Sequence, residues 1–406
     1  MPFEVPEGWK WQKLGDIGEW QSGATPSRLN KDYYGGDIPW LKTGDLNDGY
    51  ISEIPETITQ KALEETSVKL NPAGSVLIAM YGATIGKVGI LTFPATTNQA
   101  CCACVDYQGI EQKYLFYYLL SHKDDFIMLG GGGAQPNISK EKIVDSFIPI
   151  PPLHEQKRIV DAIEQWFNLI DTLETAKVDL QMSITLAKSK ILNLAIHGKL
   201  VPQDPNEEPA IELLKRINPK FTPSDNAHDT NQLPNSWCWT TLGSLFQHNT
   251  GKALNKSDSQ EGLLKPYLTT SNVYWNCFDF TEVKEMYFKD SELEKCTVIK
   301  GDLLVCEGGD IGRASIWNYD YDICIQNHIH RLRAKGDVCQ ILYLYVLMLY
   351  KWTDKIHGKG IGLQGLSSGL LDKLVVPLPP YKEQLRIVTK IEELFAVLDE
   401  IQKSIK

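Results

Sequence analysis

The chain has 406 residues, enough for two or three domains that each bury a core of their own. Its hydrophobic content of 43% and charged content of 23% are ordinary for a globular protein, and no apolar run approaches the roughly 18 residues of a membrane-spanning helix. The net charge of −10 counts against a free-standing nucleic-acid binder, because such proteins usually carry a basic patch. Nine cysteines without framework spacing are typical of a reducing compartment, so we expect a cytoplasmic protein without a membrane segment.

The sequence repeats itself at a spacing of about 228 residues, which is the separation of Ile159 and Ile387. Four segments return in the same order with related residues. The matched pairs are 9–15 and 237–243, 39–43 and 266–270, 82–87 and 308–313, and 149–160 and 377–388. Two related but unequal modules suit a target with two similar but different halves, and DNA is the leading candidate.

Each repeat is predicted to be a β-rich module followed by one helix. Residues 74–80 and 301–306 are typical of buried strands entered from a tight turn, and residues 114–120 and 343–349 of short apolar helices. A proline-rich exit then leads into the long helix, because proline is tolerated in the first helical turn. The predicted segments are a first module at 1–152, a spacer helix at 153–197, a linker at 198–232 with a short helix from 208 to 217, a second module at 233–380 and a distal helix at 381–406.

The two helices carry the strongest periodic signal. Apolar residues recur at alternating steps of four and three, which specifies a coiled-coil seam. The seam residues are Ile159, Ile163, Trp166, Ile170, Leu173, Leu180, Ile184, Ile191 and Leu194 in the first helix, and Ile387, Ile391, Leu394, Leu398, Ile401 and Ile405 in the second. The predicted fold is therefore α+β, with two similar β-rich globular domains separated by a long antiparallel two-helix coiled coil in a pseudo-two-fold repeat. Amphipathic helices packed on separate domain surfaces are the alternative.

The usual signatures of an enzyme site are absent from the sequence. Residues 82–87 have the wrong spacing for a phosphate-binding loop, and the glycines at 130–133 follow a helix, as a plain loop would. Cys101 and Cys104 form a C-x-x-C pattern in a strand-like stretch, which favours buried thiols over zinc. His328 and His330 share one strand face without a third ligand nearby. We expect no catalytic residue, metal or cofactor in this chain.

Polar loops at matching places in both modules remain as candidates for function. Amides and hydroxyls can read base edges, whereas a cation beside a glycine can hold a phosphate. Ordinary turn residues are the alternative interpretation. The candidates are Lys42, Thr43, Asp45, Lys87, Gln135, Asn137 and Ser139 in the first module, and Thr269, Thr270, Asn272, Arg313, Lys359, Gln364 and Ser367 in the second.

Across essentially its whole length the chain resembles the specificity subunits of Type I restriction–modification systems. The resemblance is carried by Trp-x-Trp-x-x-Leu-Gly openings at Trp9 and Trp237, and by residues 82–87, 135–139, 151–156 and 198–204. It implies two target-recognition domains that each read one part of a bipartite, asymmetric site in double-stranded DNA, with the helical spacer setting the gap. In two respects the chain departs from the pattern: the distal helix is shorter than its counterpart, and the Gln-Pro-Asn-Ile-Ser motif is altered at 364–368.

The resemblance also implies partners. Two copies of an adenine-methylating subunit would dock on the spacer, and restriction subunits would complete the complex. S-adenosylmethionine, Mg²⁺ and ATP would belong to those partners, which would also supply most of the phosphate neutralisation that this acidic chain lacks. Two other functions remain as alternatives: a stand-alone DNA-modifying enzyme, and a coiled-coil scaffold whose modules bind a ligand other than DNA.

Overall fold

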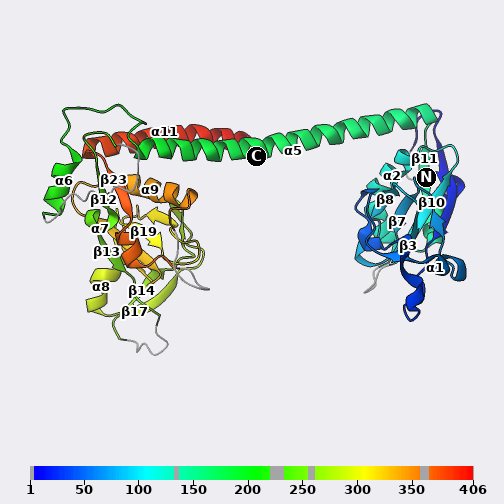
Figure 1. The fold of residues 1–406 in the computed structure, drawn as a ribbon, viewed down its shortest axis with the longest axis horizontal. Helices are drawn as coiled ribbons and strands as arrows, with labels where there is room; N and C mark the ends of the chain where they lie inside the picture. Colours follow the sequence, from blue (N-terminus) through cyan, green and yellow to red (C-terminus); the bar gives the residue numbers. More distant parts are fainter. Residues whose placement is uncertain (1–3, 132–136, 220–232, 255–260, 357–364, 406) are drawn as a thin grey trace. The chain divides into compact units, whose positions relative to one another are not determined.

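A computed structural model of the chain describes residues 4–131, 137–219, 233–254, 261–356 and 365–405 (Figure 1). The chain divides into two compact units, Met1–Glu174 and Thr175–Lys406. The helix α5 (Leu153–Ile196) is 44 residues long and contributes to both units. Its bounds agree with the spacer helix predicted at 153–197, although the predicted scheme assigns the whole helix to a segment of its own.

The first unit is a layered α+β structure built on two sheets. The five-stranded sheet runs in the order β2 (Gly18–Ser22), β10 (Cys101–Tyr107), β7 (Val76–Ala79), β8 (Val88–Leu91), β4 (Gly49–Ile51). The four-stranded sheet runs in the order β5 (Thr57–Ile58), β3 (Tyr34–Leu41), β9 (Ala95–Thr97), β6 (Leu70–Asn71). A short pair joins β1 (Lys10–Lys13) to β11 (Phe147–Ile150).

Strand alternation explains how β7 serves two cores. Leu77 and Ala79 face the apolar cluster shared with β3 and β9, whereas Val76 and Ile78 face the cluster shared with helix α2. All four residues are buried, as predicted for the apolar run at 74–80. The helices of this unit are α1 (Gln60–Glu65), α2 (Gln112–Ser121), α3 (Lys123–Leu129), α4 (Lys140–Asp145) and the first part of α5.

The cysteines of the C-x-x-C pattern lie in β10 and are free and buried. Cys102 and Cys104 belong to the cluster under α2, and Cys101 points to the opposite core. Burial raises the pKa of the Cys102 thiol to about 12, so the thiol stays protonated. The interpretation as buried thiols is therefore confirmed.

Among the described residues, the second unit repeats the strand order of the first, except that its first sheet has no strand corresponding to β4. The second sheet of each unit contains one parallel pair. β3 pairs with β9 in parallel through Trp40 and Thr96, and β14 pairs with β21 in the same way through Tyr267 and Cys324. The first sheet runs in the order β13 (Phe246–Thr250), β22 (Ile329–Ala334), β19 (Leu303–Cys306), β20 (Ala314–Ile316). The second sheet runs in the order β17 (Lys284–Phe288), β14 (Leu263–Leu268), β21 (Ile323–Ile325), β18 (Thr297–Val298). Two short pairs join β12 (Cys238–Thr241) to β23 (Val375–Leu378) and β15 (Val273–Tyr274) to β16 (Cys277–Phe278). The internal repeat predicted from the sequence is a structural repeat.

The second unit also contains helices in addition to the C-terminal part of α5. They are α6 (Ala210–Ile217), α7 (Leu242–Leu245), α8 (Asp290–Cys296), α9 (Gln340–Trp352), α10 (Ser368–Asp372) and α11 (Tyr381–Ser404). Ala210, Leu213 and Leu214 of α6 are buried in the same core as α9, so part of the segment predicted as a linker belongs to this unit. Within the described residues, no helix is long and apolar enough to cross a membrane.

The predicted coiled-coil seam is covered over only part of its length. In the second unit α11 lies antiparallel along the C-terminal part of α5 (Figure 1): Lys188 Nζ is 2.5 Å from Asp399 Oδ1, and Leu192 and Ile196 share a core with Ile387 and Ile391. The 24 residues of α11 are too few to cover the 44 of α5. Within the described residues, α11 therefore covers only the C-terminal part of the predicted seam on α5, as expected from a distal helix shorter than its counterpart.

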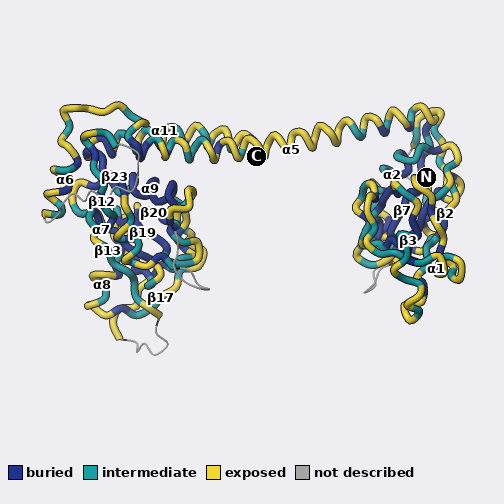
Figure 2. Tube along the Cα trace, in the orientation of Figure 1, coloured by how far each residue is buried: buried dark blue, intermediate teal, exposed yellow. Residues whose placement is uncertain are grey.

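Several seam residues have surroundings other than a partner helix. Ile159 packs against the core of the first unit, whereas Trp166, Ile170 and Leu173 are exposed. Figure 2 shows the middle of α5 as mostly exposed. In the second unit Ile184 is buried, while Leu180 and Ile401 are exposed. The remaining positions are partly buried, namely Ile163, Ile191, Leu194, Leu394, Leu398 and Ile405.

Candidate nucleic-acid interface

The first candidate loop of each unit is a tight turn after an equivalent strand, β3 in the first unit and β14 in the second. In the first unit the backbone N–H of Lys42 donates to Asp45 Oδ2 over 2.8 Å. In the second unit the backbone N–H of Thr269 donates to Asn272 Oδ1, also over 2.8 Å. Asp45 and Asn272 therefore have the same structural role, because the side-chain oxygen of each accepts the backbone N–H three residues earlier and closes the turn.

Asn272 is further committed to the fold. It is 3% exposed, and its Nδ2 donates to the carbonyls of Asp279 and Glu282, 2.9 Å from each. The turn interpretation therefore accounts for all the polar atoms of this side chain. Thr269 Oγ1 contacts Ser271 and Asn272 within the same turn. Thr43 and Thr270 are partly exposed beside these turns.

Lys42 is held by a carboxylate. Its Nζ lies 2.8 Å from Glu56 Oε2, and Arg28 binds the other oxygen of the same group. Hydrogen bonds from Arg28 and Lys42 lower the pKa of the Glu56 carboxyl, so it remains charged and keeps both cations in place. The Lys42 side chain is 43% exposed and still faces solvent.

The cations of the second candidate loop reach back to the first. Lys87 Nζ is 3.4 Å from the Leu46 carbonyl, and Arg313 Nη2 is 2.5 Å from the Thr270 carbonyl. The Arg313 guanidinium also stacks on Tyr274, 4.5 Å from the ring centre. The structure therefore brings the first two candidate loops together in each unit.

Glycines permit this approach. Gly86 precedes Lys87 with φ 77°, and Gly312 precedes Arg313 with φ 81°, both in the region that favours glycine. A Cβ on Gly86 would lie 2.9 Å from Lys123 Cγ, so the turn has no room for a side chain. The matching Gly-Lys and Gly-Arg pairs in the sequence therefore reflect a backbone requirement shared by both units.

The stem of the third candidate loop adjoins the second loop in each unit. The backbone N–H of Ile138 donates to the Met80 carbonyl, and that of Leu366 donates to the Glu307 carbonyl, both over 2.8 Å. Asn137 and Ser367 are exposed beside these bonds, and Ser139 Oγ accepts the Lys142 N–H at the start of α4. Gln135, Lys359 and Gln364 lie outside the described residues.

Several buried polar residues of the second unit were not predicted from the sequence. Arg331 is 1% exposed and donates to the Glu294 and Thr297 carbonyls and to Asn249. His330, considered only as a metal ligand, is fully buried in contact with His248. Within the described residues, no group of three or more histidine, cysteine, aspartate or glutamate side chains could hold a metal ion. The sequence feature that could have revealed these residues is that their counterparts in the first module are apolar.

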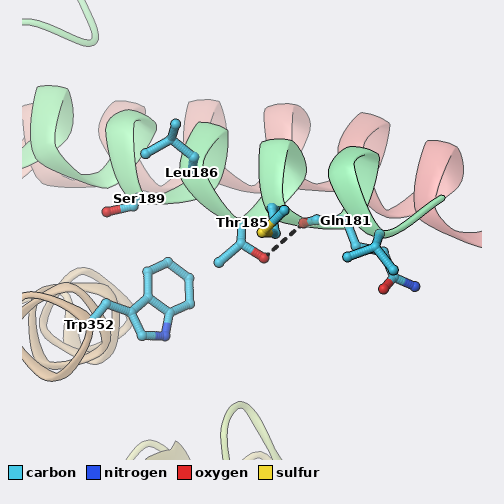
Figure 3. A pocket seen from close by; sticks show the side chains of 7 residues that line it. Gln181, Thr185, Leu186, Ser189 and Trp352 are labelled. Atoms are coloured by element: carbon cyan, nitrogen blue, oxygen red, sulfur yellow. Dashed lines mark hydrogen bonds between the residues drawn. The ribbon is translucent and has the colours of Figure 1, made fainter. Parts of the chain in front are cut away.

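An apolar groove lies in the second unit between α5 and the end of α9. It encloses about 440 Å³ and is lined mainly by exposed side chains of α5, with Trp352 of α9 on its other side (Figure 3). The lining residues on α5 are Val178, Gln181, Met182, Thr185, Leu186 and Ser189. Met182 and Leu186 are 59% and 71% exposed, which is unusual for apolar residues unless another chain covers them.

Comparison with known proteins matches these features to one family. The model of the Type I restriction modification DNA specificity domain matches residues 6–181 and 234–406. The Type I restriction enzyme MjaIX specificity subunit of Methanocaldococcus jannaschii is 24% identical over 418 residues, covering 99% of this chain and 90% of that protein. A chain from a structure on complex assembly and conformational transition of the type I R-M system has a TM-score of 0.69 at 18% identity, covering 100% of this chain and 94% of its own length. The HsdS subunit from Thermoanaerobacter tengcongensis gives 0.61 at 19% identity, covering 99% and 93%.

Proposed function

Because this chain belongs to the Type I restriction modification DNA specificity family, we propose that it is the non-catalytic DNA-recognition subunit of a restriction–modification complex. The observation that carries the proposal is the repeated module. Apart from β4, both units have the same strand order, and both bring equivalent loops together, while the residues of these loops differ. Each unit then reads one half of a bipartite, asymmetric DNA site, and the helical spacer sets the gap between the halves.

The complex is completed by other chains. Two copies of an adenine-methylating subunit dock on the spacer, and restriction subunits join them. The exposed apolar residues of α5 and the groove beside Trp352 support this docking, because a partner helix would cover them. S-adenosylmethionine, Mg²⁺ and ATP belong to those subunits. The net charge of −10 is consistent with a complex in which the partner subunits neutralise most of the DNA phosphates. The complex acts in the cytoplasm.

Genome-wide mapping of methylated adenines tests the function. The chain is co-expressed with the methylating subunit of its own system in a host that lacks adenine methylation. We expect methylation only at sites with two short motifs separated by a fixed number of unspecified bases. A single uninterrupted motif would contradict the proposal, as would methylation or cleavage by this chain alone.

Lys87→Ala and Arg313→Ala are expected to weaken binding to all DNA sequences alike. A lost phosphate contact lowers the slope of log K against log salt by about one and leaves the recognised motif unchanged. Binding of the reconstituted complex to specific and unrelated duplexes, titrated with salt, measures both quantities. Lys10→Ala is the matched control, since Lys10 is an exposed lysine on β1 outside the candidate loops. An altered methylation motif would contradict the phosphate role.

Thr270→Ala is expected to relax recognition at one half-site only. Loss of a base contact costs about 1–3 kcal/mol, which lowers discrimination at the affected base pair by about tenfold or more. Competition with duplexes changed one base pair at a time measures the loss in each half. Thr389→Ala on α11 serves as the control for removal of an exposed threonine hydroxyl. Unchanged discrimination in both half-sites would remove Thr270 from the interface.

A further inference from the structure

A chain of buried polar groups crosses the second unit and ends at the stem of the third candidate loop. His248 Nδ1 lies 2.7 Å from Asp372 Oδ1, and His248 Nε2 lies 2.9 Å from His330 Nδ1. His330 Nε2 lies 2.6 Å from the carbonyl oxygen of Leu366. His330 is fully buried, the His248 side chain is 7% exposed, and Asp372 reaches the surface at 41%.

The equivalent place in the first unit is apolar. The counterparts, each at the repeat spacing of about 228 residues, are Val144 for Asp372, Trp20 for His248, Cys102 for His330 and Ile138 for Leu366. Strand register confirms the match, because Ser22 pairs with Cys102 as Thr250 pairs with His330. All four counterparts pack in or against one apolar core. The first unit therefore folds without a polar chain at this place, whereas the second unit contains one.

The three contacts together require one proton more than two neutral imidazoles carry. The carbonyl of Leu366 and the ionised carboxylate of Asp372 can only accept, so His330 Nε2 and His248 Nδ1 must both donate. The contact between the two rings needs a third N–H, since two facing lone pairs repel. A neutral imidazole supplies one N–H, and two rings supply two. Every contact becomes a hydrogen bond only when one ring is an imidazolium.

The surroundings place the additional proton on His248. Burial lowers the pKa of His330 to about 4, and the nearby His248 and His328 act in the same direction, whereas the Leu366 carbonyl and Asp372 oppose the shift. His328 lies at the entry to β22, 3.5 Å from Glu307. His330 therefore stays neutral with its proton on Nε2. His248 touches the carboxylate directly, and an imidazolium there forms an ion pair with Asp372.

We propose that the Asp372–His248–His330 chain is a proton-dependent latch that positions the Leu366–Ser367 stem for recognition of the second half-site. The Leu366 carbonyl is held by His330, and its N–H is held by the Glu307 carbonyl, so the stem is fixed on both sides. Histidine changes its charge near neutral pH. Removal of the additional proton leaves one of the three contacts without an N–H, so two lone pairs face each other and the stem is released. The first half-site has no such dependence.

The structural part of the latch is tested without DNA. Nitrogen-15 NMR of the histidines in the full chain shows which ring nitrogens carry protons, and His330→Cys and Asp372→Asn assign the two rings. At about pH 6 we expect both nitrogens of His248 to be protonated, and only Nε2 of His330. Asp372→Asn retains an acceptor for His248 but removes the carboxylate charge, so the two rings should lose the additional proton at lower pH. Two neutral rings at about pH 6 would overturn the proton count.

The recognition part rests on the proposed function and is measured in the reconstituted complex. Between about pH 6 and pH 8.5, discrimination at the second half-site should fall about tenfold, while that at the first stays constant. Asp372→Asn should shift this loss to lower pH, and His330→Cys, which installs the residue of the first unit, should abolish the pH dependence. Equal pH effects on both half-sites, or an unchanged profile in Asp372→Asn, would overturn the latch. A complex without any bipartite motif would instead refute the proposed function.

Discussion

Replacing Gln156 by alanine is expected to lower the free energy of unfolding of the first unit by about 3 kcal/mol. The Gln156 side chain is fully buried where α5 meets the module. Its Nε2 donates to the carbonyls of Gly109 and Pro151 over 3.1 and 2.9 Å, and its Oε1 accepts the Glu111 N–H over 2.7 Å. Alanine would leave these three backbone groups buried without partners, which costs more than the bonds themselves contribute.

The equivalent glutamine of the second unit, Gln384, allows the same test. Gln384 is also fully buried, with Oε1 accepting the Cys339 N–H over 2.8 Å and Nε2 donating to the Pro379 carbonyl over 2.9 Å. With two bonds in place of three, Gln384→Ala should destabilise its unit by about 2 kcal/mol. Urea unfolding followed by tryptophan fluorescence measures both variants, with the two units fitted as separate transitions. Gln12→Ala on β1 is the exposed control, and a loss below about 1 kcal/mol for Gln156→Ala would contradict the account.

The Glu-Gln pair at 155–156 and 383–384 shows what the sequence could and could not reveal. The repetition of this pair is visible in the sequence, but the role of the pair in the fold is not. The structure shows that the glutamine joins each long helix to its module. Glu383 has a separate role, since it accepts bonds from Trp237 Nε1 over 2.9 Å and from Gln203 Nε2. Burial raises the pKa of this carboxyl, a consequence of its depth that no spacing rule predicts.

Elements defined by local pattern were predicted well. The buried strands β7 and β19, the helices α2 and α9, and the long helix α5 follow from apolar runs, helical spacing and proline at helix starts, which act within a few residues of each other. The extent of the α5–α11 pairing was not predictable in the same way. A heptad pattern indicates that a face is apolar, but what covers Trp166 or Leu173 depends on the length of a helix more than 200 residues away.

For the candidate loops, too, the position was predictable from the sequence but the role of each side chain was not. The sequence located the turns correctly, and the structure brings the first two loops together through Lys87 and Arg313. The sequence did not distinguish side chains that form a turn from those that remain available to a ligand. Asn272 and Asp45 illustrate this limit, because the same residue type can close a turn or contact a base.

Insertion of one heptad into α5 is expected to lengthen the gap between the two DNA half-sites by about three base pairs. Seven helical residues add about 10.5 Å at 1.5 Å each, and successive base pairs rise about 3.4 Å. A heptad departs from whole helical turns by only about 20°, so the relative rotation of the two ends of the helix is nearly conserved. A duplication of residues 168–174 is suitable, since it repeats the exposed Leu169, Ile170 and Leu173 and lies before the residues that contact α11.

The insertion is assayed by mapping methylated adenines with the methylating subunit present. Both half-motifs should be unchanged and only the number of bases between them should increase, because each unit keeps its own loops. Two alanines inserted after Glu174 form the matched control: they add little length but turn the helix by about 200°, which should abolish methylation instead of changing the gap. Retention of the original gap after the heptad insertion would mean that the spacing is set by the partner subunits and not by α5.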